Sequence, residues 1–99
     1  MASLDIYMVI VTLRQIINER ISFLREQINP DNKPAVNKTF QLQINAIRSI
    51  DDFDIEKVES IIKQKKALLR NIKDVYESEK LFSELDGLEW LRRQILRYS

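Results

Sequence analysis

The sequence predicts an all-α protein, a small bundle of three or four antiparallel helices, on the basis of three observations. Apolar residues recur at helical spacing along most of the 99 residues. Glycine occurs once and proline twice, which leaves few places for the hairpin turns that a many-stranded fold needs. The apolar fraction of 44% and the charged fraction of 31% are typical of a folded chain. At this length we expect residues 1–99 to form one domain.

The first helix is predicted over about residues 4–28, because Pro30 disfavours helix in the residue before it. A second apolar row of Val9, Ile16 and Phe23 widens its main stripe. So broad an apolar face needs cover from other helices, or from a second copy of the chain that completes the bundle. We therefore expect this helix to be central. Its main stripe is the candidate core or dimer surface and consists of Ile6, Ile10, Leu13, Ile17, Ile21, Leu24 and Ile28.

The second helix is predicted over about residues 35–49, where Val36, Phe40 and Ile44 follow one another at helical spacing. Residues 39–44 also alternate between apolar and polar, which is typical of a strand. A lone strand would have no partner in an otherwise helical chain unless a second copy supplied one. We favour the helix.

The third helix is predicted over about residues 54–78. Asp54 is suited to accept hydrogen bonds from the first free amides of this helix. Phe53 before it and Val58 after it have the spacing of a hydrophobic staple. We expect this helix and the first one to form the long antiparallel pair of the bundle.

A fourth helix is predicted over about residues 81–98, which carry another apolar stripe interrupted by Gly87. Two arrangements remain open: a break near residues 78–83, or one long helix that bends at Gly87. We favour the break, because an unbroken helix would need a partner along its whole length.

Residues that carry chemistry are scarce. The sequence contains no cysteine and no histidine, which removes disulfides, thiolate metal sites and the commonest general base. A calcium loop read from Asp52 would have Lys57 where glycine is needed and Lys63 where glutamate is needed. Gly87 alone makes no phosphate-binding loop. We therefore expect no enzyme activity, no cofactor and no metal.

Four basic residues share one face of the predicted third helix, away from its apolar stripe. They are spaced three, four and three residues apart, and this face is the candidate nucleic-acid surface: Lys63, Lys66, Arg70 and Lys73. Nearby glutamates can equally pair with these residues on a solvated face. No DNA-binding motif accompanies the patch.

The C-terminal segment holds the candidate partner surface, Trp90, Arg93 and Arg97. Tryptophan and arginine are enriched in binding hot spots, and an arginine can stack on an indole ring. Two alternatives compete with this interpretation. Trp90 can close the end of the core, and the arginines can simply complement the helix dipole.

The predicted function is that of a small protein–protein interaction module, an adaptor or regulatory protein that acts through its apolar helix faces and forms a homodimer. The alternative is a nucleic-acid-binding accessory protein that uses the basic face of the third helix. A net charge of +1 favours neither nucleic acid nor a membrane surface as partner. We expect a cytoplasmic protein without membrane contact, because the apolar run 6–11 is far too short to span a bilayer.

Overall fold

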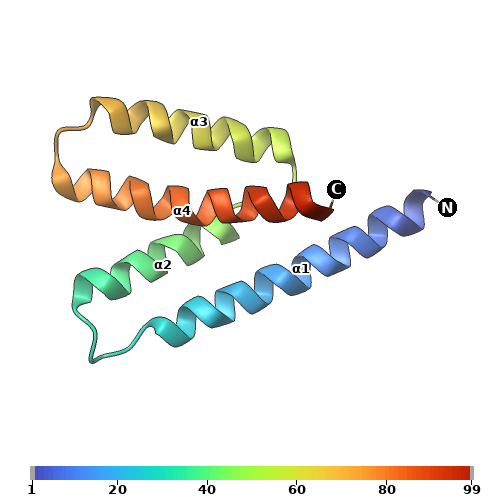
Figure 1. The fold of residues 1–99 in the computed structure, drawn as a ribbon, viewed down its shortest axis with the longest axis horizontal. Helices are drawn as coiled ribbons and strands as arrows, with labels where there is room; N and C mark the ends of the chain where they lie inside the picture. The colour runs from blue at the N-terminus through green and yellow to red at the C-terminus, as the bar shows by residue number, and fades with distance from the viewer. Residues whose placement is uncertain (1, 99) are drawn as a thin grey trace.

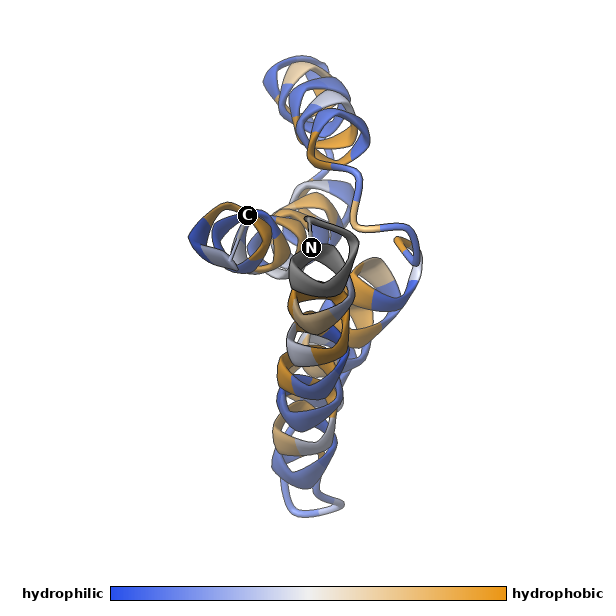
Figure 2. Cartoon of the chain, turned by 90° about the vertical axis from the view of Figure 1, so that its right-hand side faces the viewer, coloured by the Kyte–Doolittle hydropathy of each residue, from blue (hydrophilic) through white to orange (hydrophobic). Residues whose placement is uncertain are grey.

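The computed structural model describes the backbone of residues 2–98 and the side chains of residues 7–98. Within this part the chain forms four α-helices and no strand, which confirms the all-helical prediction and places residues 39–44 in a helix. The Cα atoms extend over 50 × 34 × 16 Å, so the molecule is a thin assembly of helices (Figures 1 and 2). The helices are α1 (Ala2–Gln27), α2 (Pro34–Arg48), α3 (Ile55–Asn71) and α4 (Val75–Tyr98).

The central helix is α4. It contacts all three other helices, whereas α1 and α3 do not contact each other within the described part of the chain. α3 lies antiparallel to α4, and α2 passes behind α4 (Figure 1). Two expectations were therefore wrong: the first helix is not central, and it does not pair with the third.

Gly87 accounts for the close packing of α4 against α2. A Cβ atom at this residue would lie 2.8 Å from the carbonyl oxygen of Gln43 in α2. The absent side chain therefore lets the backbones of α2 and α4 approach closely. No break or bend is needed at Gly87, since α4 continues through it.

The hydrophobic core contains side chains from all four helices. Trp90 and Tyr98 of α4 pack against its edge. In the predicted stripe of α1, Ile10 and Ile28 are half-buried, and the side chain of Ile6 lies outside the described residues. Phe23, predicted to widen the stripe, is 48% exposed. The remaining stripe residues are buried in the core: Leu13, Ile17, Ile21 and Leu24.

Two aspartates fix where α3 and α4 begin. The side chain of Asp54 accepts hydrogen bonds from the backbone N–H groups of Glu56 and Lys57, which confirms the predicted cap. Asp74 does the same for α4, at 2.8 Å from the N–H of Tyr76 and 3.4 Å from that of Glu77. α3 consequently ends at Asn71, and the break lies at residues 72–74 instead of near residues 78–83.

Candidate interaction surfaces

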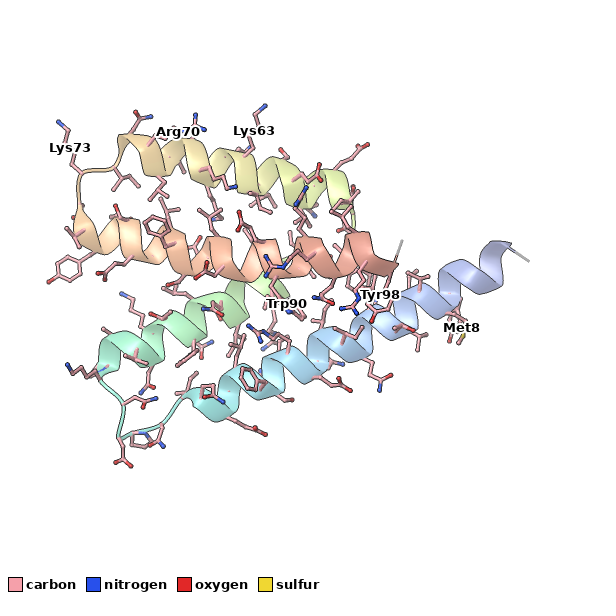
Figure 3. The ribbon with its side chains drawn as sticks, in the orientation of Figure 1. Met8, Lys63, Arg70, Lys73, Trp90 and Tyr98 are labelled. Carbon is pink, nitrogen blue, oxygen red and sulfur yellow. The ribbon has the colours of Figure 1, made fainter. Side chains whose placement is uncertain are left out.

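Trp90 points from α4 toward α1 (Figure 3). The arginine that stacks on it is Arg20 of α1, whose Cζ lies 5.5 Å from the centre of the Trp90 ring. The same Cζ lies 5.3 Å from the centre of the Phe23 ring. The guanidinium group of Arg20 is thus held against two aromatic rings from two helices. We call Arg20, Phe23 and Trp90 the Trp90 cluster.

Within the Trp90 cluster, Arg20 has an unusual environment for a charged side chain. Its Nε is buried and donates no hydrogen bond to any described residue. Arg20 as a whole is half-buried, and it forms no ion pair with a described residue. A buried donor without an acceptor is costly in free energy. The contacts with the two rings compensate part of that cost.

The two arginines that the sequence placed beside Trp90 make other contacts. Arg93 follows Trp90 by one helical turn and is exposed. Arg97 is also exposed, and its Cζ lies 5.9 Å from the centre of the Tyr98 ring. Neither arginine forms an ion pair with a described residue. The predicted partner surface therefore carries two unpaired cations beside the Trp90 cluster.

Arg20 is not among the candidate residues predicted from the sequence, although the sequence holds a signal for its unusual position. Arg20 follows Leu13 by seven residues and precedes Leu24 by four, which places it inside the apolar stripe of the first helix. Phe23, three residues further on, is its neighbour on the helix surface. A cation in an apolar stripe requires either a carboxylate or an aromatic partner. The partner Trp90 lies on another helix, so the spacing alone does not reveal it.

Three basic residues of α3 line a groove of about 460 Å³ between α3 and α4. Lys63, Lys66 and Arg70 contribute to its wall, whereas Lys73 falls in the loop after α3 and is not among the lining residues. Lys63 and Arg70 point outward from the edge of the molecule (Figure 3). The structure therefore brings together three of the four residues of the predicted nucleic-acid surface.

Half of the cations in this groove are neutralised by neighbouring carboxylates. The Nζ of Lys66 lies 2.9 Å from an oxygen of Glu89. The Nε of Arg92 lies 3.2 Å from an oxygen of Glu59. Lys63 and Arg70 form no ion pair with a described residue, so they carry the remaining positive charge of the groove.

The N-terminal extension of α1, residues 2–11, projects beyond the C-terminal end of α4 (Figure 1). Met8 points away from the other helices (Figure 3). The exposed fractions are 63% for Tyr7, 60% for Met8 and 42% for Val11. On the other side of the extension, Val9 and Ile10 are half-buried. The described side chains of the extension are therefore apolar on both sides of the helix.

The acidic cluster at the start of α3 serves the local backbone. The backbone N–H of Asp54 donates to Asp52 over 3.3 Å, and the Nζ of Lys57 lies 3.4 Å from the same carboxylate. This N–H and, after it, Lys57 hold the pKa of Asp52 below its usual value. Among the described side chains no group of three or more histidines, cysteines or carboxylates is placed to hold a metal ion.

Two further findings bear on the class of protein. None of the helices, over the residues described, has the length and hydrophobicity needed to cross a membrane. No protein-family model, curated protein or solved structure matches this chain. The geometry defines a small all-helical protein with three distinct surfaces: the Trp90 cluster, the α3–α4 groove and the N-terminal extension of α1.

Proposed function

We propose that the protein is a protein–protein interaction module that self-associates through the N-terminal extension of α1. The exposure of Tyr7, Met8 and Val11 carries this proposal. A helix that is apolar all round is normally buried. Within the described residues, only the side of the extension that carries Val9 and Ile10 is partly buried. The opposite side therefore requires a contact with another molecule.

A second copy of the chain fits as that cover. No charged residue lies between Asp5 and Arg14, so two copies can pack together over residues 6–13 without burying a charge. An antiparallel pair about a two-fold axis brings the same apolar surface into contact from both sides. Because the extension projects past α4 (Figure 1), a second copy can approach it without displacing another helix.

The test is the mass in solution, measured by analytical ultracentrifugation at high micromolar concentration. We expect the wild-type chain to sediment near twice 11.8 kDa. The double variant Tyr7→Glu with Met8→Glu is expected to sediment as a monomer, because two carboxylates in a contact between copies repel each other. Monomers of the wild-type chain at that concentration would refute self-association.

A matched control exists at the start of α4. Val75 and Tyr76 are also adjacent, apolar and exposed, at 65% and 82%. The double variant Val75→Glu with Tyr76→Glu places the same charges in the first turn of a helix and should leave the dimer intact. Dissociation of this control to the same extent would mean that the extension is not the contact.

A nucleic-acid role for the α3–α4 groove is the second candidate, favoured by the unpaired cations Lys63 and Arg70. Glu59 and Glu89 in the same groove work against it, because they repel a phosphate backbone. Such binding would weaken steeply with salt, and the variant Lys63→Glu with Arg70→Glu would abolish it. A wild-type chain that nucleic acid does not retain at low salt excludes this candidate.

A further inference from the structure

We infer that the Trp90 cluster is a binding site for a carboxylate on an acidic segment of a partner protein, and that Arg20 is the residue that holds it. The inference rests on the proposed role as an interaction module and names a partner for it. It concerns a different surface from the N-terminal extension of α1, so a second, unlike protein can bind while the chain is a dimer.

The guanidinium group of Arg20 is already restrained in the absence of a partner. An arginine side chain has many rotamers, and fixing it on binding costs free energy. Here the contacts with Phe23 and Trp90 already restrict the guanidinium, at 5.3 Å and 5.5 Å from the two ring centres. The two terminal nitrogens of the planar guanidinium have the fork geometry that suits a carboxylate.

Arg20 also lacks an anionic partner within the chain. The four ion pairs between described residues involve other lysines and arginines. Burial of Nε removes water from one edge of the charged group. A charge-assisted hydrogen bond is stronger where the surroundings are less polar than water. A carboxylate from outside would therefore gain more at Arg20 than at an ordinary surface arginine.

The neighbouring residues add positive charge on one side of the cluster. Arg93 follows Trp90 by three residues and Arg97 by seven, which places both on the Trp90 side of α4. Both are exposed, and neither has an ion pair with a described residue. Together with Arg20 they form a positive surface around one partly buried tryptophan, the residue types that dominate binding hot spots.

The surroundings favour an acidic protein segment over a nucleic acid. Single-stranded nucleic acids bind by stacking bases on open aromatic faces, but Arg20 already lies over the rings of Phe23 and Trp90. Glu19 precedes Arg20 on α1 and is exposed. Its carboxylate would repel a continuous phosphate backbone. A protein segment of mixed charge can place one carboxylate on Arg20 and avoid Glu19.

Trp90 gives the experiment its readout, because it is the single tryptophan of the chain. The probe is a synthetic helical peptide without tryptophan that carries leucine on one face and glutamate on the next. Its reference is the same peptide with glutamine in place of glutamate. We expect the glutamate peptide to shift the Trp90 emission in a saturable manner, and the glutamine peptide to bind at least about tenfold more weakly.

Substitutions at Arg20 test whether the peptide binds at the Trp90 cluster. Arg20→Gln should weaken binding of the glutamate peptide at least about tenfold, and Arg20→Lys should weaken it less, since lysine keeps the charge but lacks the planar fork. The matched control is Arg14→Gln. Arg14 is also on α1 and lies 5.4 Å from the centre of the Phe53 ring, but away from Trp90, so this variant should bind like the wild-type chain. Circular dichroism verifies the fold of each variant.

Three outcomes would overturn the inference: no saturable shift with the glutamate peptide, equal binding by the Arg20→Gln chain, or tighter binding of a single-stranded oligonucleotide at the same salt concentration. The titration is repeated with the Tyr7→Glu, Met8→Glu variant. If this variant binds the glutamate peptide, the site at the Trp90 cluster is supported even when the wild-type chain proves monomeric. If the wild-type chain dimerises but does not bind the peptide, the site is refuted and the proposed self-association is not.

Discussion

α1 and α4 are the two longest helices of the molecule, and they are used in opposite ways. α4 touches each of the other three helices and buries side chains along most of its length. α1 has the broader apolar face in the sequence, yet within the described residues it touches only α2 and α4, and its first turns project beyond them (Figure 1). Apolar width therefore does not determine which helix is central.

The difference lies in how closely a neighbour can approach. At Gly87 the α4 backbone comes close enough to Gln43 that a Cβ atom would clash. The described part of α1 contains no glycine. In α4, the glycine lets another backbone cross the helix at close range. The surplus apolar width of α1 remains at the surface, where it is available to a partner.

The largest effect is expected at the centre of α4. Leu91 is 0% exposed, so Leu91→Ala should remove about 2–5 kcal/mol from the free energy of unfolding. Urea denaturation followed by circular dichroism measures the loss. A loss below about 0.5 kcal/mol would show that α4 is not the packing centre.

A second test concerns Gly87 itself. By helix propensity alone, Gly87→Ala would stabilise α4 by roughly 1 kcal/mol. Because the new methyl group would meet backbone atoms of Gln43 at 2.8 and 3.2 Å, we expect a net destabilisation of about 1–3 kcal/mol instead. A higher urea midpoint would indicate that helix propensity dominates, and a lower one that the clash with Gln43 dominates. A more stable variant would contradict the role assigned to Gly87 in the close approach of α2 and α4.

The smallest effect is expected in the extension of α1. Val11 is 42% exposed, so Val11→Ala in the Tyr7→Glu, Met8→Glu background should change the free energy of unfolding by less than about 0.5 kcal/mol. The same denaturation assay applies. A loss as large as that of Leu91→Ala would mean that Val11 belongs to the core, and the contrast between the two helices would disappear.

The local features of the fold could be read from the sequence. Helical spacing indicated three or four helices, and Asp54 indicated the start of the third. The break before α4 was misplaced because the apolar spacing runs on past Asn71, while Asp74 competes by capping a new helix at Tyr76 and Glu77. An aspartate followed three residues later by glutamate is a recognisable helix start, so this signal was present in the sequence.

The tertiary features could not be read in the same way. Gly87 was interpreted as a cost to a helix, because its benefit depends on Gln43, which is 44 residues away in the chain. The Trp90 cluster likewise joins two helices far apart in sequence. The candidate residues Trp90, Arg93 and Arg97 could be selected by type and spacing. The contact of Arg20 with Trp90 becomes visible only when α1 lies beside α4.

The attachment of α3 has a consequence for the dynamics of the molecule. α3 contacts α4 and no other helix within the described residues, and it lies at one edge of a molecule only 16 Å thick. Helices with few neighbours open locally at a lower free energy than the whole protein unfolds. Amide hydrogens of α3 should therefore exchange with solvent sooner than those at the middle of α4. Each such opening exposes the side of α4 that α3 covers. The α3 edge of the bundle therefore opens and closes reversibly while the rest of the protein stays folded.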